Sequence, residues 1–224
     1  IRLARDTGGQ LFFLRRDEAG SIATLADFVV RSNAVDVLSV ADIFSGAPKT
    51  YAVPVDSTLT RVNFSASGTT TVTLTRPDGT VVQATDPGVR LLALSTGAVY
   101  SIVGPAPGAW SVTVNGSGDF SLNVSGVSGL SLDAFRFVEL GGRIGHQGLY
   151  PIAGFPAMGQ TTKADAEMSG DLASAAFELR SKAGVMLQSL SLNPDSPGSH
   201  EFFGDVAVPN APFLAYVTGS DAAG

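Results

Sequence analysis

The residues of this chain whose types could do chemistry are two histidines and a few pairs of carboxylates. His146 lies in a glycine-rich stretch and His200 stands beside Glu201, so a metal site could have at most two histidine ligands, completed by carboxylates. The chain has no cysteine, which excludes disulfides, thiolate catalysis and cysteine zinc sites. We interpret both histidines as ordinary loop positions and predict no cofactor.

Two carboxylate pairs, Asp17–Glu18 and Asp165–Glu167, have the residue types needed for acid–base catalysis. The first pair falls in a polar loop, and the second shares one face of a predicted strand. We interpret both as solvated surface charge, because Asp and Glu are seldom buried unpaired. A nucleophilic serine would need a positioned base and an orienting acid, and no Gly-x-Ser-x-Gly elbow surrounds a serine here. The sequence therefore predicts no catalytic residue and no enzyme.

Calcium is the metal that two turns of the chain would suit best. Residues 116–119 and 193–196 place oxygen ligands in turns, but a site of six to eight oxygens needs more acids than either turn offers. Asx-turn chemistry explains both turns without a metal, and we favour that interpretation. The glycine-rich stretch 141–145 lacks the strand-turn-helix setting of a phosphate loop, so we interpret it as a connection.

A group of aromatic residues in the C-terminal half has two interpretations. Phe202 and Phe203, with Tyr150 and Phe155, could mark an exposed partner surface or could fill a second hydrophobic core. We favour the core, because Phe is usually buried.

Composition limits the classes of partner. The chain has 20 acidic and 14 basic residues, and this net charge of −6 opposes the counterion release that drives binding to nucleic acid or anionic lipid. Hydrophobic residues make up 44%, enough to bury a core. No apolar run approaches the roughly 20 residues of a membrane span, and IRLARD lacks the apolar region of a signal peptide. We therefore expect no membrane span, and a signal, if one exists, upstream.

The first 35 residues predict a helix, a strand and a second helix. Residues 1–6 read as the end of a helix that Gly8 or Gly9 closes, and residues 11–14 (LFFL) predict a strand covered on both faces. Ser21 is the predicted N-cap of a helix that ends near Asn33, and its apolar face comprises Ile22, Leu25, Phe28 and Val29. Such a piece of an α/β sheet cannot bury itself alone.

From residue 36 the pattern changes to the alternation that is typical of strands with one buried face. The predicted strands comprise residues 60–65, 71–75, 80–83, 90–94, 98–103, 109–114 and 120–124. Residues 76–79 (RPDG) predict a hairpin turn, and Trp110 is the predicted core anchor. Six or seven short strands in about 90 residues match an immunoglobulin-sized β-sandwich.

A second β-sandwich is predicted from residue 129, with strands in 131–140, 161–168, 175–180, 185–188 and 208–217. Residues 175–188 echo 72–83, and PNAPFLAYV echoes PAPGAWSVTV, so we interpret the two regions as copies of one topology. In the first copy the strand DFSLNV follows the echo. We expect the second copy to lack this last strand. The predicted fold is mainly β, with an α/β remnant at 1–35 and two tandem immunoglobulin-like sandwiches at 36–128 and 129–224.

Two resemblances bear on function. IRLARDTGGQLFFL followed by an amphipathic helix resembles the closing segment of a von Willebrand factor A domain. That family's metal-coordinating Asp-x-Ser-x-Ser loop is not in this chain, and residues 36–39 do not match it, so no residue of that site can be carried over. LTRPDGTVV, PGAWSVTVNGSGDFSLNVSG, HQGLYPIAGFPAMGQ and PNAPFLAYVTGSDAAG resemble the region after the A domain in hemicentin and in the von Willebrand factor A domain-containing protein 7 group.

Two functions from different classes follow. The hemicentin resemblance implies a non-catalytic, extracellular or cell-surface adhesion segment that presents an A-type domain and binds a protein or matrix partner. Self-association through exposed strand edges is a further expectation. The alternative is an accessory module of a secreted bacterial hydrolase, because the PGxWxVxV pattern also resembles the β-sandwich appended to bacterial extracellular peptidases. Upstream sequence would discriminate them, and we expect this chain to be a fragment of a longer protein.

Overall fold

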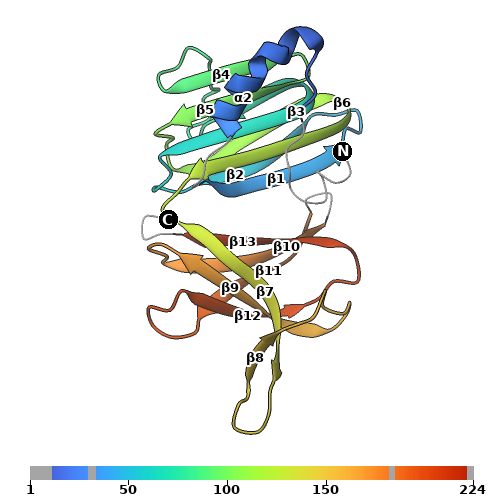
Figure 1. Ribbon diagram of the computed structural model, residues 1–224, viewed down its shortest axis with the longest axis vertical. Helices are drawn as coiled ribbons and strands as arrows, with labels where there is room; N and C mark the ends of the chain where they lie inside the picture. Colours follow the sequence, from blue (N-terminus) through green and yellow to red (C-terminus); the bar gives the residue numbers. More distant parts are fainter. Residues whose placement is uncertain (1–11, 30–33, 182–184, 221–224) are drawn as a thin grey trace. The chain divides into compact units, whose positions relative to one another are not determined.

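The computed structural model describes residues 12–29, 34–181 and 185–220, and it is mainly β, as predicted. The chain divides between Ser128 and Gly129 into two compact units, which are described separately (Figure 1). No helix in the described ranges is long and apolar enough to cross a membrane.

The first unit begins with a short helical segment. Residues 12–15 have no regular structure, a 3-10 helix η1 spans Arg16–Ser21, and α2 spans Ile22–Val29. The prediction of a buried strand is therefore wrong for residues 12–14, and Phe13 is 43% exposed. Residues 1–11, with the predicted first helix, and Asn33 lie outside the described residues.

Helix α2 packs against one face of the first sheet (Figure 1). Leu25 and Phe28 are buried with Val99, and Phe12 and Leu14 pack against them. This confirms two of the four predicted core positions of the helix. The prediction is wrong for a third position, Ile22, which lies at the start of α2 and is 58% exposed. Ser21 is not the N-cap either, because it ends the 3-10 helix that leads into α2.

Polar contacts fasten this segment to the turn that follows strand β4 (Val89–Leu94). The Glu18 carboxylate accepts hydrogen bonds from the amides of Arg15 (2.8 Å) and Ser95 (2.6 Å), and these bonds hold the pKa of Glu18 below its usual value. Thr96 donates to the carbonyl of Phe13 at 2.8 Å. Segment and sheet therefore belong to one unit.

The first sheet is antiparallel and has six strands in the order β1-β6-β3-β5-β4, with β2 also paired to β6. Besides β4, its strands are β1 (Val35–Ile43), β2 (Lys49–Val55), β3 (Arg61–Thr75), β5 (Gly97–Val103) and β6 (Gly108–Val127). The predicted turn at 76–79 is confirmed: the Gly79 amide donates to the Arg76 carbonyl at 2.9 Å. Residues 80–83 form only an isolated bridge, Thr75 to Val81.

Two long strands, β3 and β6, replace four predicted short ones. β3 contains both 60–65 and 71–75 apart from Thr60, and β6 contains both 109–114 and 120–124. Their middles shift register between Ser67 and Thr71, where Gly68 has a φ of 78° and a Cβ would lie 2.2 Å from the carbonyl oxygen of Asp119. The glycine-rich middles bend the strands without ending them. Each strand thereby contributes its two halves to different parts of the sheet.

The core of the first unit lies around Trp110, as predicted. Trp110 is 1% exposed, its ring lies 5.9 Å from that of Phe64, and its indole N–H donates to the Ala106 carbonyl at 2.8 Å. Val53 from β2 and Val112 from β6 are fully buried beside it. The apolar alternation of these strands therefore faces a single core.

The opposite face of β3 is polar and is also buried. Asn63 and Ser65 are each 4% exposed, although the alternation of 60–65 predicted one buried face only. The Asn63 amide donates to the carbonyl of Phe28 at 2.9 Å, so the covering helix explains the burial. A sheet face can be buried by a helix from outside the sheet, which strand periodicity does not reveal.

The second unit is a seven-stranded antiparallel arrangement in the order β13-β10-β11-β12-β9-β7-β8. Its strands are β7 (Ser131–Gly141), β8 (Gly148–Pro151), β9 (Thr161–Ser169), β10 (Ser174–Ser181), β11 (Met186–Pro194), β12 (Glu201–Ala207) and β13 (Phe213–Ser220). β11 and β12 pair only at residues 193–194 and 202–203, so the order folds into two layers. The predicted strands 161–168 and 175–180 are confirmed, whereas β8 and β12 were not predicted.

The two layers of the second unit enclose a core of aromatic and aliphatic side chains. Phe177 of β10 is fully buried, and its ring stacks on that of Phe135 from β7 at 5.1 Å. Phe137 contacts Phe177 edge-on at 6.3 Å, and Phe202 is 6% exposed in the same core. Residues from both ends of this unit's sequence therefore meet around one buried phenylalanine.

Candidate functional site: an apolar groove in the second unit

The loop that joins β8 to β9 forms one wall of a groove. Gly154 and Gly159 have positive φ angles and Pro156 cannot donate to a ladder, so this loop forms no strand. The Ile152 amide donates to the Phe137 carbonyl at 2.9 Å, and the Gly159 amide donates to the Val208 carbonyl at 2.9 Å. The loop is thus anchored at both ends, and its middle is presented outward.

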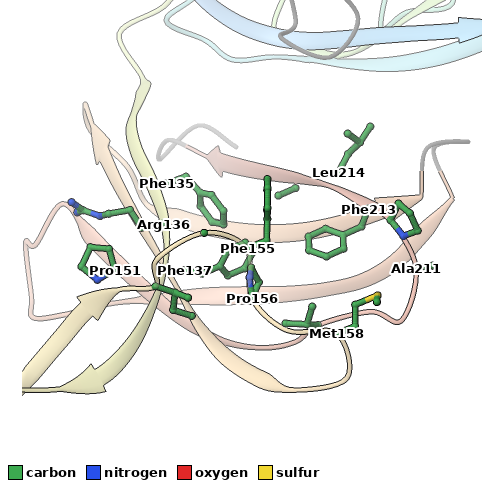
Figure 2. Close-up of a pocket in the computed structure, with 15 residues that line it drawn as sticks. Phe135, Arg136, Phe137, Pro151, Phe155, Pro156, Met158, Ala211, Phe213 and Leu214 are labelled. Carbon is green, nitrogen blue, oxygen red and sulfur yellow. The ribbon is translucent and has the colours of Figure 1, made fainter. Parts of the chain in front are cut away.

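The groove has a volume of about 680 Å³ and lies between β7, this loop and the start of β13 (Figure 2). It is lined by Phe135, Arg136, Phe137, Pro151, Ile152, Gly154, Phe155, Pro156, Met158, Val208, Ala211, Pro212, Phe213, Leu214 and Ala215. Two of the loop side chains are largely exposed, Phe155 at 97% and Met158 at 68%. Exposed apolar side chains that lie together along a groove are typical of a binding surface.

The one charged residue of the lining, Arg136, is already paired. Its guanidinium lies 3.0 Å from the carboxylate of Asp165, 3.6 Å from that of Glu167 and 3.9 Å from that of Glu201. Asp165 is only 4% exposed, whereas the side chain of Arg136 is 37% exposed, so the first of these pairs is buried on the carboxylate side only. The guanidinium of Arg136 is therefore engaged in these ion pairs, and the remaining lining of the groove is apolar.

The chemistry of the lining suits binding and not bond-making. None of the fifteen lining residues is a serine, threonine, histidine, lysine or carboxylate. Nucleophilic or acid–base catalysis needs such groups within hydrogen-bonding reach of a bound molecule. This groove can bury apolar side chains of a ligand and can fix its position by shape.

The two histidines lie on the surface of the second unit. His146 is exposed in the β7–β8 hairpin, where its backbone carbonyl accepts a bond from the Tyr150 hydroxyl at 3.1 Å, and His200 is exposed before β12. Within the described ranges no three His, Asp or Glu side chains come close enough to hold a metal.

The carboxylate pairs differ from the prediction at two positions. Asp17 is exposed, but Glu18 is half-buried by its bonds to the β4–β5 turn. Glu167 is exposed, whereas Asp165 is buried, so the prediction of solvated surface charge is wrong for Asp165. The reason is its cross-strand position opposite Arg136, which the sequence of β9 alone does not contain.

In both turns considered for calcium, backbone groups form hydrogen bonds with other parts of the chain. Residues 116–119 lie within β6, and the Gly118 carbonyl accepts a bond from the Phe44 amide at 3.0 Å. In the second turn the Asp195 amide donates to the Glu201 carbonyl at 2.9 Å. Gly141 ends β7, and residues 142–147, which include the rest of the glycine-rich stretch, connect it to β8.

The core interpretation of the aromatic group is confirmed for Phe202 and wrong for two others. Tyr150 is 47% exposed on β8, and Phe155 is the most exposed aromatic residue of the groove. Sequence reasoning missed Phe135, Phe137 and Phe213 as groove residues. The alternating FRF of residues 135–137 was the available signal, but it also fits a core strand.

Comparisons with known proteins agree on one relationship. A family model described as hemicentin galactose-binding domain-like matches residues 35–129. Mouse (Mus musculus) hemicentin-2 is 26% identical over 225 residues, which cover 98% of this chain and 4% of that protein. Mouse hemicentin-1 is 28% identical over 134 residues, covering 59% of this chain and 2% of that protein. The chain therefore spans only a few per cent of the length of these relatives.

A solved structure of the Bacillus licheniformis lipase BlEst2 in its propeptide form is also matched. The TM-score is 0.34 and the identity 13%, over 79% of this chain and 44% of that chain, which is too low to support an argument on fold or activity. The family match begins at β1 and ends just after β6, so it covers the whole first sheet. Residues 35–129 therefore form a β-domain that is similar to this hemicentin family.

Proposed function

We propose that this chain is a non-catalytic, extracellular adhesion or scaffold segment that binds a protein or matrix partner. The observation that carries the proposal is the match of residues 35–129 to the hemicentin family model, together with the alignment of 98% of the chain to hemicentin-2. The groove of the second unit supports a binding role, because its lining is apolar and carries no group that could act as nucleophile or base.

The finer form of the proposal concerns the neighbouring part of the protein. We propose that the two units are tandem immunoglobulin-like sandwiches that support a von Willebrand A-type ligand-binding domain, on the strength of the resemblance of residues 1 to about 34. Sequencing the coding region upstream of Ile1 tests this. An A domain with its metal-coordinating loop would support it, whereas a catalytic domain would favour the accessory-module function.

Two measurements test the adhesion proposal itself. Antibodies against this chain should label intact cells or matrix of the source organism, and labelling only after permeabilisation would contradict an extracellular role. Surfaces coated with the chain should retain cells of that organism better than albumin-coated surfaces do. Equal retention on the two surfaces would contradict adhesion.

A further inference from the structure

The last strands of the two units have matching places in their sheets. In the first unit, the N-terminal half of β6 pairs with the C-terminal half of β3, with Val112 opposite Leu74. In the second unit, β13 pairs in the same antiparallel sense with β10, with Ala215 opposite Leu179. The segments that precede these partners also correspond, because the N-terminal half of β3, residues 61–67, pairs with β5 as β9 pairs with β12. We therefore compare the edge of β6 that faces away from β3 with the edge of β13 that faces away from β10.

The edge of β6 that faces away from β3 is paired with another strand of the same unit. β2 pairs antiparallel with β6, and Val53 lies opposite Trp110. Val53 is fully buried and Val55 is 3% exposed, so alternate residues of β2 face the core. As a result Trp110, Val112 and Val114 are at most 1% exposed.

The outer edge of β13 has no such cover in the described part of the chain. β13 pairs with β10, and neither a strand nor a backbone hydrogen bond from another described residue joins its other edge. The residues of β13 that face the core are correspondingly less buried: Phe213 and Val217 are half-buried, and Ala215 is exposed. The groove lies along β13, whose residues Phe213, Leu214 and Ala215 belong to its lining, and Figure 2 shows the ring of Phe213 on this side.

We propose that the groove and the open edge of β13 bind an extended segment of a partner protein, added as a strand antiparallel to β13. Apolar side chains at every second position of that segment would enter the groove beside Phe137 and Phe213. The first unit supplies the argument for this occupant, because there the same edge is covered by a strand with Val53 and Val55 at alternate positions. Strand addition supplies main-chain hydrogen bonds for affinity and side-chain pockets for specificity.

The lining of the groove includes the strand whose open edge an extended ligand would pair with. Its lining follows the strand β13 at consecutive residues 213–215 and continues along residues 135–137 of β7. Phe155 projects beside it and would cover one face of a bound strand. This inference deepens the proposed protein-binding function by naming the class of partner, and it rests on that function.

A selection experiment tests the proposal on the full chain. A library of short random peptides displayed on phage is selected against the wild-type chain, and the enriched peptides are measured by fluorescence anisotropy. We expect apolar residues at alternating positions and slower exchange of the β13 amides when a peptide is bound. Failure to enrich any peptide, enrichment of helix-type spacing, or unchanged exchange at β13 would overturn strand addition.

Matched variants assign the binding to the groove. Phe155→Asp changes a side chain that is 97% exposed in the groove loop, and Ile144→Asp changes one that is 97% exposed in the β7–β8 hairpin. Both should fold, and only Phe155→Asp should weaken the selected peptides, by about tenfold or more. Equal weakening, or none, would overturn the groove site.

Two further outcomes separate this proposal from the others. If the chain dimerises in sedimentation experiments and Phe155→Asp makes it monomeric, a second copy is the occupant and the partner-segment proposal is wrong. If Phe155→Asp leaves both peptide binding and cell retention unchanged, adhesion stands and the groove proposal fails. Loss of cell retention in Phe155→Asp, with Ile144→Asp unaffected, would support both.

Discussion

Replacing Phe28 by alanine should unfold the first unit at a much lower temperature. Phe28 is 3% exposed, it packs with Leu25 and Val99, and the Arg90 guanidinium lies 4.6 Å from its ring centroid. Truncating a buried phenylalanine costs about 3–5 kcal/mol, and an exposed cation–π contact adds about 0.5 kcal/mol. Because this site lies at the edge of the unit, we expect a loss of about 3–4 kcal/mol, or roughly 10–15 °C in melting temperature.

The single tryptophan makes the assay specific. Trp110 is 1% exposed in the core of the first unit, so its fluorescence reports on that unit alone. Ile22→Ala is the matched control, since Ile22 lies on the same helix and is 58% exposed; its effect should stay within about 0.5 kcal/mol. If the two variants melt at the same temperature, the helical segment is not a structural part of the first unit.

Three further predictions follow from particular contacts. Arg136→Met should destabilise the second unit by about 2–3 kcal/mol in calorimetry, because it leaves the buried carboxylate of Asp165 without its counter-ion. The double variant Arg136→Met, Asp165→Asn should recover most of this loss, and a double variant as unstable as Arg136→Met alone would contradict the pairing. Gly68→Ala should lower the urea midpoint of unfolding, monitored by tryptophan fluorescence, much more than Gly46→Ala does. Both glycines have a positive φ, but only at Gly68 would a Cβ meet backbone, 2.2 Å from the carbonyl oxygen of Asp119. Similar midpoints for the two variants would refute this close approach. Glu18 has a lowered pKa in the folded state, so its stabilisation is present above its unfolded pKa of about 4.3 and is lost as the pH falls through the folded value. Glu18→Gln should therefore be less stable than wild type at pH 7, and this difference should disappear in strong acid; a difference that persists there would contradict the assignment.

Several features of the fold could be predicted because they depend on neighbours in sequence. The turn at 76–79 follows from proline, aspartate and glycine in order, and the strands within 161–168 and 175–180 follow from alternation. Helix α2 and its buried residues Leu25 and Phe28 follow from helical spacing. Each of these signals is complete within about ten residues of chain.

The candidate site could not be predicted in the same way, because contacts between distant segments create it. Phe155 belongs to a residue type that is usually buried. It lines a groove instead, because a loop and not a strand follows β8. Asp165 is buried because Arg136 lies opposite it on a neighbouring strand. Pairing partners of this kind lie 29 residues apart in this instance, beyond the reach of a local pattern.

The amino-acid sequence alone was enough to predict a mainly β chain without cysteine chemistry, whose first core contains Trp110. Composition and periodicity carry that information, since they decide which side chains can be buried together. Contacts between distant segments join the predicted short strands into β3 and β6, place α2 on the polar face of the first sheet, and leave one edge of β13 without a paired strand in the described part of the chain. Strand alternation tells which face of a strand is buried, but the partners at its two edges are set by the rest of the chain.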